Sequence, residues 1–283
     1  SKREVHECRH RKRESLMRAS RSIRFAACAL IAAATSLSVI APAHATAPSQ
    51  VAASNSKVTG TITVSAASSL ADVFPAIGKA FQKRYPGTTV RFNFGGSSTL
   101  VNQIKGGAPV DVLATASETT MLSAVTAGLV GMPAAFAKNT MAIAMPSDNP
   151  AKIRSLADLA RPGTLVGVCA ATVPCGAAAR ELLALNKVSI TPVTQELDVR
   201  SLLGKVVSGD LDAGIVYATD VKAVGNKVKS VQIPARLNVT TTYQIATVGE
   251  TRNPEAAQRF VDYVRYSLSA QGLLRAYGFA RHW

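Results

Sequence analysis

From residue 61 to residue 277, short β-branched apolar runs alternate with longer stretches that have helical spacing. In the first such stretch, Leu70–Tyr85, the residues Val73 and Ile77 fall on one helical face. Pro86 and Gly87 then end the pattern, since neither residue continues a helix well. Strands that alternate with helices fold into layers in which helices cover both faces of a sheet. The sequence therefore predicts an α/β fold, and the 238 residues after position 45 suffice for two lobes of ordinary size.

The same alternation of strands and helices continues to Tyr277. The predicted strands are Thr61–Val64, Val90–Phe94, Asp111–Ala114, Met141–Met145, Leu165–Val168, Val193–Glu196, Ala213–Tyr217, Val228–Ile233 and Thr241–Val248. The predicted helices are Leu70–Tyr85, Leu100–Ile104, Met121–Ala127, Cys175–Leu185, Val199–Ser208, Asp220–Val224, Pro254–Leu268 and Gly272–Tyr277.

The first 57 residues are expected to lie outside the folded part. Residues 17–45 have the order of a secretory signal peptide: basic residues after Met17, an apolar run over Phe25–Ile40 and the small-residue motif Ala43-His44-Ala45. Residues 1–16 precede Met17 and are interpreted as a non-native start, and residues 46–57 as a disordered tether. An uncleaved anchor helix is the less favoured alternative, because a membrane span needs roughly 20 apolar residues. We expect an exported protein in the periplasm or at the outer face of the cell membrane.

The net charge of +15 suggests a nucleic-acid partner, but its distribution argues against one. Residues 1–45 contain nine Lys/Arg and three Asp/Glu, so this segment carries +6 and the rest of the chain +9. The +9 is spread over 238 residues without a basic cluster beside aromatic residues and without a nucleic-acid motif. A diffuse positive field suits the steering of small anions, and a merely soluble surface is equally compatible with it.

Histidine is nearly absent after residue 45, where only His282 occurs. A Ser-His-Asp hydrolase or a His-ligated zinc enzyme therefore lacks its essential residue type. A serine hydrolase built on Ser69 or Ser97 would need a lysine base, for which Lys79 and Lys105 are the candidates, and a G-x-S-x-G motif is missing. The sequence favours a binding protein over an enzyme, with no cofactor and no direct protein–metal ligands.

After residue 45 the only cysteines are Cys169 and Cys175, which five residues separate. In an exported protein a disulfide is the default for such a pair, and two free thiols are the alternative. No CxxC motif is present, so a thioredoxin-like redox function has no support.

Five turns share one arrangement, in which small or hydroxyl residues follow the end of a predicted strand. They are Ala66–Leu70, Gly95–Leu100, Val173–Gly176, Leu197–Arg200 and Ile215–Asp220. A helix N-terminus leaves its first N–H groups without intrahelical acceptors, and these donors together with the helix dipole bind anions. Any one such turn is more often an ordinary helix cap. Several of them facing one cleft would offer many neutral donors to a small anion.

Six motifs follow one another in order: TVSAASSLADVF, FNFGGSSTLVNQI, GAPVDVLATAS, VPCG, LDVRSLLGKV and AGIVYATD. With this order and spacing the chain resembles the molybdate-binding proteins of bacterial ABC importers, a group within the periplasmic binding proteins. The resemblance runs from about Ile62 to Tyr277-Gly278-Phe279. It implies two α/β lobes, each a mixed sheet flanked by helices, joined by crossing strands with the oxyanion clamped between them. We expect residues 58–139 and 235–283 to form lobe 1 and residues 140–234 to form lobe 2.

The same resemblance implies five ligand-binding residues. Ser69 and Ser97 would donate through hydroxyl and amide, Cys175 and Val199 through the backbone N–H, and Tyr217 through its phenol.

Two positions depart from the family pattern. Ser68 stands where alanine is frequent, which leaves a shift of one residue open at the first motif. Cys175 stands where a small residue is usual, and a disulfide to Cys169 would pre-organise its backbone donor.

A pocket made only of donors selects anions by their protonation. Molybdate, tungstate and sulfate are fully deprotonated dianions, whereas hydrogen phosphate carries a proton that needs an acceptor. Asp198 and Asp220 would supply acceptors if they pointed inward, and helix capping is the favoured alternative for both. Molybdate or tungstate as ligand is what the resemblance implies, and a transport protein for sulfate or another small oxyanion is the competing interpretation. The expected partner is the membrane permease of an ABC importer, with the binding protein acting as a monomer.

Overall fold

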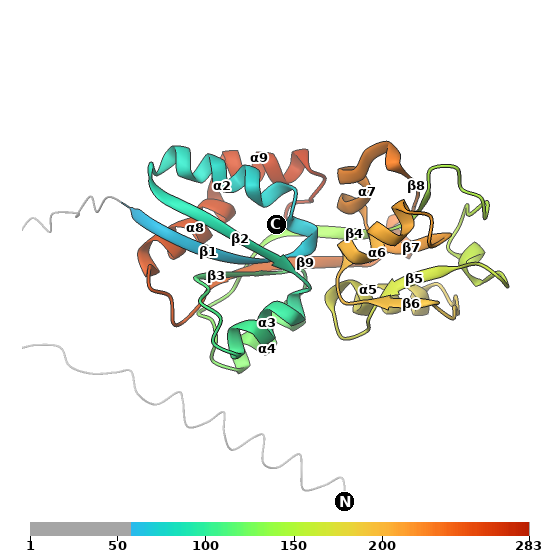
Figure 1. The fold of residues 1–283 in the computed structure, drawn as a ribbon, viewed down its shortest axis with the longest axis horizontal. Coiled ribbons are helices and arrows are strands. Elements are labelled where there is room, and N and C mark those ends of the chain that lie inside the picture. The colour runs from blue at the N-terminus through green and yellow to red at the C-terminus, as the bar shows by residue number, and fades with distance from the viewer. Residues whose placement is uncertain (1–57, 283) are drawn as a thin grey trace, which may run out of the picture. The chain divides into compact units, whose positions relative to one another are not determined.

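The computed structural model describes residues 58–282. The predicted upstream segment, signal peptide and tether fall on residues 1–57, outside the described residues, and stay predictions. Within residues 58–282 strands and helices alternate, which confirms the predicted α/β class (Figure 1). In this part of the chain, no helix combines the length and the apolar character needed to cross a bilayer.

The strands are β1 (Thr59–Ala67), β2 (Gly87–Gly95), β3 (Val112–Thr115), β4 (Ala134–Pro146), β5 (Val166–Cys169), β6 (Thr194–Glu196), β7 (Ala213–Tyr217), β8 (Val228–Gln232) and β9 (Thr240–Thr247). The α-helices are α2 (Val73–Arg84), α3 (Ser97–Lys105), α4 (Glu118–Thr126), α5 (Pro174–Leu185), α6 (Val199–Val207), α7 (Ala218–Val224), α8 (Pro254–Tyr266) and α9 (Leu268–Ala276). Short 3-10 helices are η1 (Ser68–Leu70), η2 (Ala157–Ala160), η3 (Gly225–Lys227) and η4 (Ala235–Leu237).

Most elements lie at the predicted places with shifted ends, and three of the differences have a clear structural cause. The helix predicted from Leu70 is divided into η1 and α2, because the chain makes a tight turn directly after β1. The helix predicted over Pro254–Leu268 ends at Tyr266, since Ser267 has an extended backbone with ψ of 128°, and α9 begins at Leu268. Strand β4 begins at Ala134 rather than Met141, because pairing with β9 outweighs the weak strand preference of its first residues.

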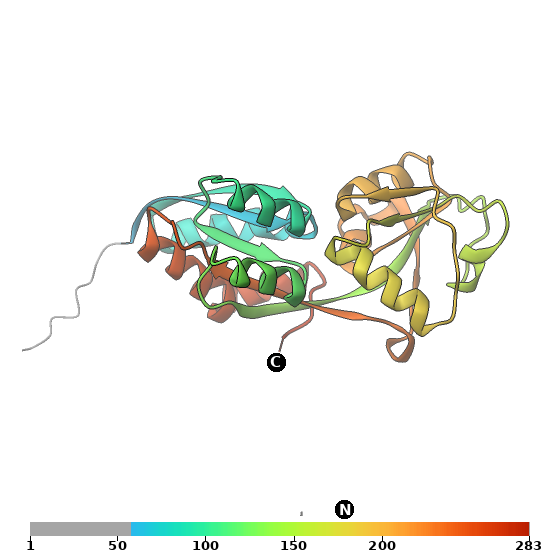
Figure 2. The same ribbon diagram turned by 90° about the horizontal axis from the view of Figure 1, so that it is seen from below.

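Two sheets share strand β4. The strand order is β2-β1-β3-β9-β4-β7-β5-β6, with β8 also paired to β4. Residues Ala134–Thr140 of β4 pair with β9, whereas residues from Met141 onward pair with β7 and β8. Strands β4 and β9 pass between the two lobes, as Figure 2 shows. The partner change lies between Thr140 and Met141, and the expected division into 58–139 with 235–283 and 140–234 stays a prediction.

Helices cover both faces of each sheet. In lobe 1, α2, α8 and α9 pack together on one face, and α3 and α4 lie on the other (Figure 1). Strand β3 shows why both layers form, because successive side chains of a strand point to opposite faces. Its Val112 and Ala114 join the core that contains Phe74, and its Leu113 joins the core under α3 and α4. In lobe 2, α6 and α7 pack on the sheet together and α5 packs on it separately.

Phe74 connects several elements of lobe 1. Its ring is fully buried and lies 6.1 Å from the ring of Phe92 on β2, 5.9 Å from Phe136 on β4 and 6.3 Å from Phe260 on α8. Aromatic pairs at such separations add stability beyond the area that they bury. The Phe74 side chain therefore packs α2 against the sheet of lobe 1 and against α8.

We predict that Phe74→Ala lowers the free energy of unfolding by about 3–5 kcal/mol, because it leaves a cavity where four elements meet. Equilibrium unfolding in urea measures the loss. Met132→Ala is the matched control, since Met132 is 94% exposed and its truncation should change the free energy by less than about 0.5 kcal/mol. Equal losses in the two variants would show that Phe74 is not part of a packed core.

Candidate ligand-binding site

All five turns singled out in the sequence meet at one small cavity between the lobes. Its wall is formed by Ala67, Ser68, Ser69, Gly95, Gly96, Ser97, Ala116, Val173, Pro174, Cys175, Leu197, Asp198, Val199 and Tyr217. The structure thus brings together the five expected ligand-binding residues, although they come from distant parts of the chain. Ser68 lies in the same wall beside Ser69, so both residues of the first motif reach the cavity.

Ser69 lies in η1, directly after β1, and is only 4% exposed. Its hydroxyl is 2.7 Å from the hydroxyl of Tyr243 on β9. Its backbone N–H belongs to the first turn of η1, where no intrahelical acceptor is in reach.

Ser97 is the first residue of α3, and Gly96 is the N-cap of this helix. The Ser97 oxygen accepts a hydrogen bond of 3.1 Å from the backbone N–H of Ala116, which leaves the serine proton free to be donated elsewhere. Gly96 has a separate requirement. A Cβ at this position would lie 2.2 Å from the carbonyl oxygen of Leu197 in the other lobe, so only glycine lets the two backbones approach this closely.

Cys175 is the second residue of α5, after Val173 as N-cap and Pro174. Its sulfur is bonded to that of Cys169, at the end of β5, with 5.7 Å between the two Cα atoms. Gly176 packs against the same segment, because a Cβ there would lie 1.9 Å from the carbonyl oxygen of Ala170. Gly176 belongs to the third turn singled out in the sequence, but its packing against Ala170 was not predicted, since only the fold brings the two backbones together. Disulfide and glycine together fix the start of α5.

Val199 is the first residue of α6, and Asp198 is its N-cap. The Asp198 carboxylate accepts from the amides of Arg200 at 2.8 Å and Ser201 at 3.0 Å, and from the Ser201 hydroxyl at 2.8 Å. The capping interpretation of Asp198 is therefore confirmed. Asp198 takes the next two amides of the helix and leaves that of Val199 to the cavity.

Tyr217 ends β7 and is the N-cap of α7. Its side chain is 1% exposed, and among the described residues its hydroxyl oxygen has no hydrogen-bond partner. Burial raises the pKa of the phenol well above its ordinary value, and the nearby Tyr243 and Asp220 raise it further. The hydroxyl is therefore a protonated donor in the cavity wall, and such a buried group costs about 1–3 kcal/mol when it is left unpaired.

Asp220 is not part of the cavity wall and is paired with a cation. Its buried carboxylate accepts from the Tyr217 N–H at 3.2 Å and lies 3.2 Å from Nε of Arg200. Arg200 also contacts Asp72, which belongs to the other lobe. Burial raises the pKa of Asp220 to about 7, against the opposing effect of Arg200. Sequence reasoning missed Arg200 and Asp72 as partners, because no spacing rule relates residues so far apart in the chain.

The surroundings of the two serines do not favour catalysis. The hydroxyl partners of Ser69 and Ser97 are a phenol and a backbone amide, neither of which is a general base. Lys79 and Lys105 are not part of the cavity wall. Within residues 58–282, no group of three or more His, Cys, Asp or Glu side chains could hold a metal ion.

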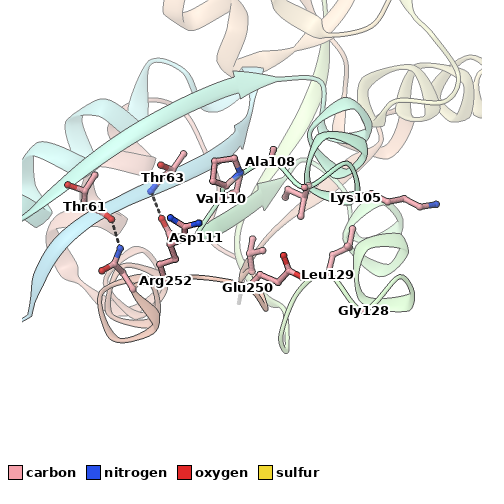
Figure 3. Close-up of a pocket in the computed structure, with 15 residues that line it drawn as sticks. Thr61, Thr63, Lys105, Ala108, Val110, Asp111, Gly128, Leu129, Glu250 and Arg252 are labelled. Atoms are coloured by element: carbon pink, nitrogen blue, oxygen red, sulfur yellow. Dashed lines mark hydrogen bonds between the residues drawn. The ribbon is translucent and has the colours of Figure 1, made fainter.

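A larger pocket lies in lobe 1 at the opposite ends of the parallel strands (Figure 3). It is lined by Thr61 and Thr63 of β1 and by Asp111 just before β3, and the Thr63 N–H donates to Asp111 at 2.7 Å. Glu250 and Arg252 place both signs of charge in its wall. Ligands of open α/β sheets gather at the carboxyl ends of strands, and the small cavity, not this pocket, lies there. The larger volume of the lobe 1 pocket therefore does not identify it as the ligand site.

The raised pKa of Asp220 leads to a pH-dependent stability. The folded protein holds this proton up to a pH of about 7, whereas the unfolded chain releases it near the ordinary value of 3.8. Through this group alone, the free energy of unfolding should fall by about 1.4 kcal/mol per pH unit as the pH rises between these values. Asp220→Asn cannot titrate and should lack this component. Urea unfolding of both proteins across this range tests it, and the same pH dependence in both would contradict the raised pKa.

The family model and the sequence relatives that match this chain are all of solute-binding proteins. The family model of bacterial extracellular solute-binding proteins matches residues 62–280. The molybdate-binding protein ModA of Mycobacterium tuberculosis strain H37Rv is 42% identical over 221 residues, which cover 78% of this chain and 84% of that protein. The molybdate-binding protein ModA of Haemophilus influenzae is 31% identical over 242 residues, which cover 77% of this chain and 89% of that protein.

A solved structure shows the same fold. The periplasmic molybdate-binding protein of Azotobacter vinelandii matches with a TM-score of 0.68 at 18% identity, over 77% of this chain and 98% of that one. The sequence matches and the family model cover the same part of the chain as this likeness. The chain therefore belongs to the bacterial extracellular solute-binding proteins and, within them, to the family of the molybdate-binding proteins that it resembles in sequence.

Proposed function

We propose that this protein captures molybdate or tungstate outside the cytoplasm and delivers the anion to the membrane permease of an ABC importer. The relatives that share 42% and 31% of their aligned residues with it carry the name molybdate-binding protein. The observation that supports the proposal most directly is the buried Tyr217 hydroxyl, which has no partner among the described residues and lines the cavity. Thr241 and Tyr243 lie near this hydroxyl but form no hydrogen bond with it, so its proton is available to a ligand.

The proposed ligand set is Ser69, Ser97, Cys175, Val199 and Tyr217. These residues offer hydroxyl and backbone N–H groups, most of them at helix starts, where the helix dipole also favours a negative charge. A dianion without protons can accept from all of them. Hydrogen phosphate would have to place its proton against donors, which leaves one group unpaired and lowers its affinity. The two carboxylates nearest the cavity, Asp198 and Asp220, are already occupied by amides and by Arg200.

Contacts across the mouth of the cavity support capture by lobe closure. The Ser98 hydroxyl of lobe 1 donates to the carbonyl oxygen of Thr172 in lobe 2 at 2.8 Å. Gly96 and Leu197 approach each other nearby, and Arg200 contacts Asp72. Rotation of the lobes about β4 and β9 would break and remake these contacts while the ligand enters and leaves.

In this proposal the protein binds its ligand without chemical change. It acts as a monomer with no cofactor, and it has no nucleic-acid partner. The diffuse positive charge of the chain after residue 45 steers small anions toward the cleft. The partner that reads the closed form is the permease.

Calorimetric titration of the chain from Thr46 onward with molybdate, tungstate, sulfate and phosphate tests the function. We expect tight one-to-one binding of the first two, and weak binding of sulfate and phosphate. Tyr217→Phe should weaken molybdate binding by roughly 10- to 100-fold, because a hydrogen bond to a charged group is lost. Tyr266→Phe is the control, since Tyr266 is 65% exposed. A preference for sulfate would assign the protein to a different oxyanion, and no binding of any of the four anions would refute the proposed function.

The disulfide supplies a second prediction. If it pre-organises the Cys175 amide, the double variant Cys169→Ser with Cys175→Ser should bind molybdate roughly 2- to 10-fold more weakly, because the loop must be ordered on binding. The substituted residue keeps its backbone N–H, so the donor itself is unchanged. Reduction of the wild-type protein should produce the same loss. Unchanged affinity in both experiments would show that the disulfide does not act on the ligand site.

A further inference from the structure

A buried chain of hydrogen bonds connects Ser69 to two residues outside the proposed ligand set, Tyr243 and Asn139. The Tyr243 hydroxyl is 2.7 Å from the Ser69 hydroxyl, and the Asn139 side-chain amide nitrogen is 3.3 Å from the Tyr243 hydroxyl. Tyr243 lies on β9 and Asn139 on β4, the two strands that pass between the lobes. All three side chains are less than 5% exposed. Hydrogen bonds buried this deeply have few alternative partners, so their directions can be deduced one by one.

The direction of the chain follows from Asn139. Its Oδ1 accepts a hydrogen bond of 3.0 Å from the backbone N–H of Thr140, and a backbone N–H can only donate. The oxygen and nitrogen of the amide are thereby distinguished. Nδ2 is the atom that faces Tyr243 and the Thr219 hydroxyl at 2.7 Å. Asn139 therefore donates to Tyr243 and cannot accept from it.

Tyr243 has one hydroxyl proton, and it donates this proton to the Ser69 hydroxyl. Because the phenol oxygen already accepts from Asn139, donation to Ser69 uses the proton in a bond of 2.7 Å. In the reverse direction the Tyr243 proton would have only the Tyr217 hydroxyl to turn to, which forms no hydrogen bond within the described residues, and a fully buried proton without a well-placed acceptor is costly. Burial also raises the pKa of Tyr243 well above its ordinary value, so the phenol keeps this proton.

We propose that Asn139 and Tyr243 form a relay that directs the Ser69 hydroxyl proton toward the ligand, and that Tyr243 is thereby a positioning residue for anion capture. This inference rests on the proposed function of the cavity. Ser69 accepts from Tyr243, so its own proton is available to the anion. Ser97 reaches the same state by a shorter route, because its oxygen accepts from the backbone N–H of Ala116. Both serines are thus set as donors before the ligand arrives.

The relay also connects the two lobes. The second proton of the Asn139 amide goes to Thr219, which belongs to α7 of lobe 2, whereas Ser69 and Tyr243 lie in lobe 1. Asn139 is held from both sides at the point where β4 changes partners. Its amide orientation, on which the direction of the relay depends, is therefore fixed by lobe 2 as well as by its own backbone.

Two single variants and their combination test the relay by calorimetric titration with molybdate. Tyr243→Phe removes the phenol and should weaken binding by about 3- to 10-fold, the effect of one neutral hydrogen bond. Asn139→Asp replaces the donor by an acceptor and should reverse the chain, so that Tyr243 donates to Asp and accepts the Ser69 proton. This variant should lose at least about 10-fold in affinity, because Ser69 no longer donates to the anion.

The decisive measurement is the double variant Asn139→Asp with Tyr243→Phe. Without the phenol, the Ser69 proton is released to the ligand again, so the double variant should bind molybdate more tightly than Asn139→Asp alone. A merely structural role of the two side chains would instead give added damage. Tyr263→Phe is the matched control, because it removes a phenol hydroxyl from α8 of the same lobe and should leave affinity unchanged.

The possible outcomes distinguish a failure of the relay from a failure of the proposed molybdate binding. If the wild-type protein binds no molybdate, the proposed function fails. If the wild-type protein binds molybdate and the double variant binds no more tightly than Asn139→Asp, the relay is refuted and the function stands. Recovered affinity in the double variant, with circular dichroism showing that all variants are folded, supports the relay.

Discussion

The change of partner within strand β4 is the constraint on which the rest of the structure depends. Up to Thr140 the strand is bonded to β9, and from Met141 it is bonded to β7 and β8. The register at this point places Asn139 opposite Thr241 and Met141 opposite Tyr217. A proposed ligand residue of lobe 2 and the relay residues of the crossing strands are therefore set side by side by backbone hydrogen bonds. A slip of one residue would turn all these side chains to the other face.

The cavity is organised so that full charges stay out of its wall or are already paired there. The Asp198 carboxylate accepts hydrogen bonds from the amides of α6. The Asp220 carboxylate pairs with Arg200 and accepts from the Tyr217 amide. The donors in the cavity wall are neutral, and the starts of α3, α5 and α6 are fixed by a glycine, a disulfide and a helix cap, respectively. Fixed neutral dipoles replace hydration water around a dianion without the cost of burying an opposite full charge. This arrangement favours the fit of an oxyanion over general attraction to negative charge.

Local patterns were sufficient to predict much of the fold and of the candidate site. Strand β7 has the predicted bounds, Ala213–Tyr217, because a short apolar run is followed directly by a helix start. The five turns could be singled out because small and hydroxyl residues follow strand ends, and the family resemblance selected one residue in each.

What the sequence did not predict depends on contacts between distant segments. The first half of β4 contains alanines and polar residues that have no strand signal of their own. Tyr243 is one aromatic residue in an ordinary strand, and only the fold places it behind Ser69. The pairing of Arg200 with Asp72 joins residues far apart in the chain, and the close approach of Gly96 to Leu197 becomes visible only when the lobes are seen together.

The contact of Arg200 with Asp72 is more exposed to solvent than the hydroxyl donor of Tyr217, and this difference affects the rate at which the lobes separate. Asp72 is 40% exposed, so solvent ions reach its carboxylate although the Arg200 nitrogen that it contacts is buried, whereas the Tyr217 hydroxyl is sealed from them. Exposed ion pairs weaken as ionic strength rises, since the screening length shrinks to about 8 Å at physiological salt, while buried neutral hydrogen bonds respond little. Salt in the medium would thus act on how fast the two lobes separate more than on how firmly the closed cavity holds its anion.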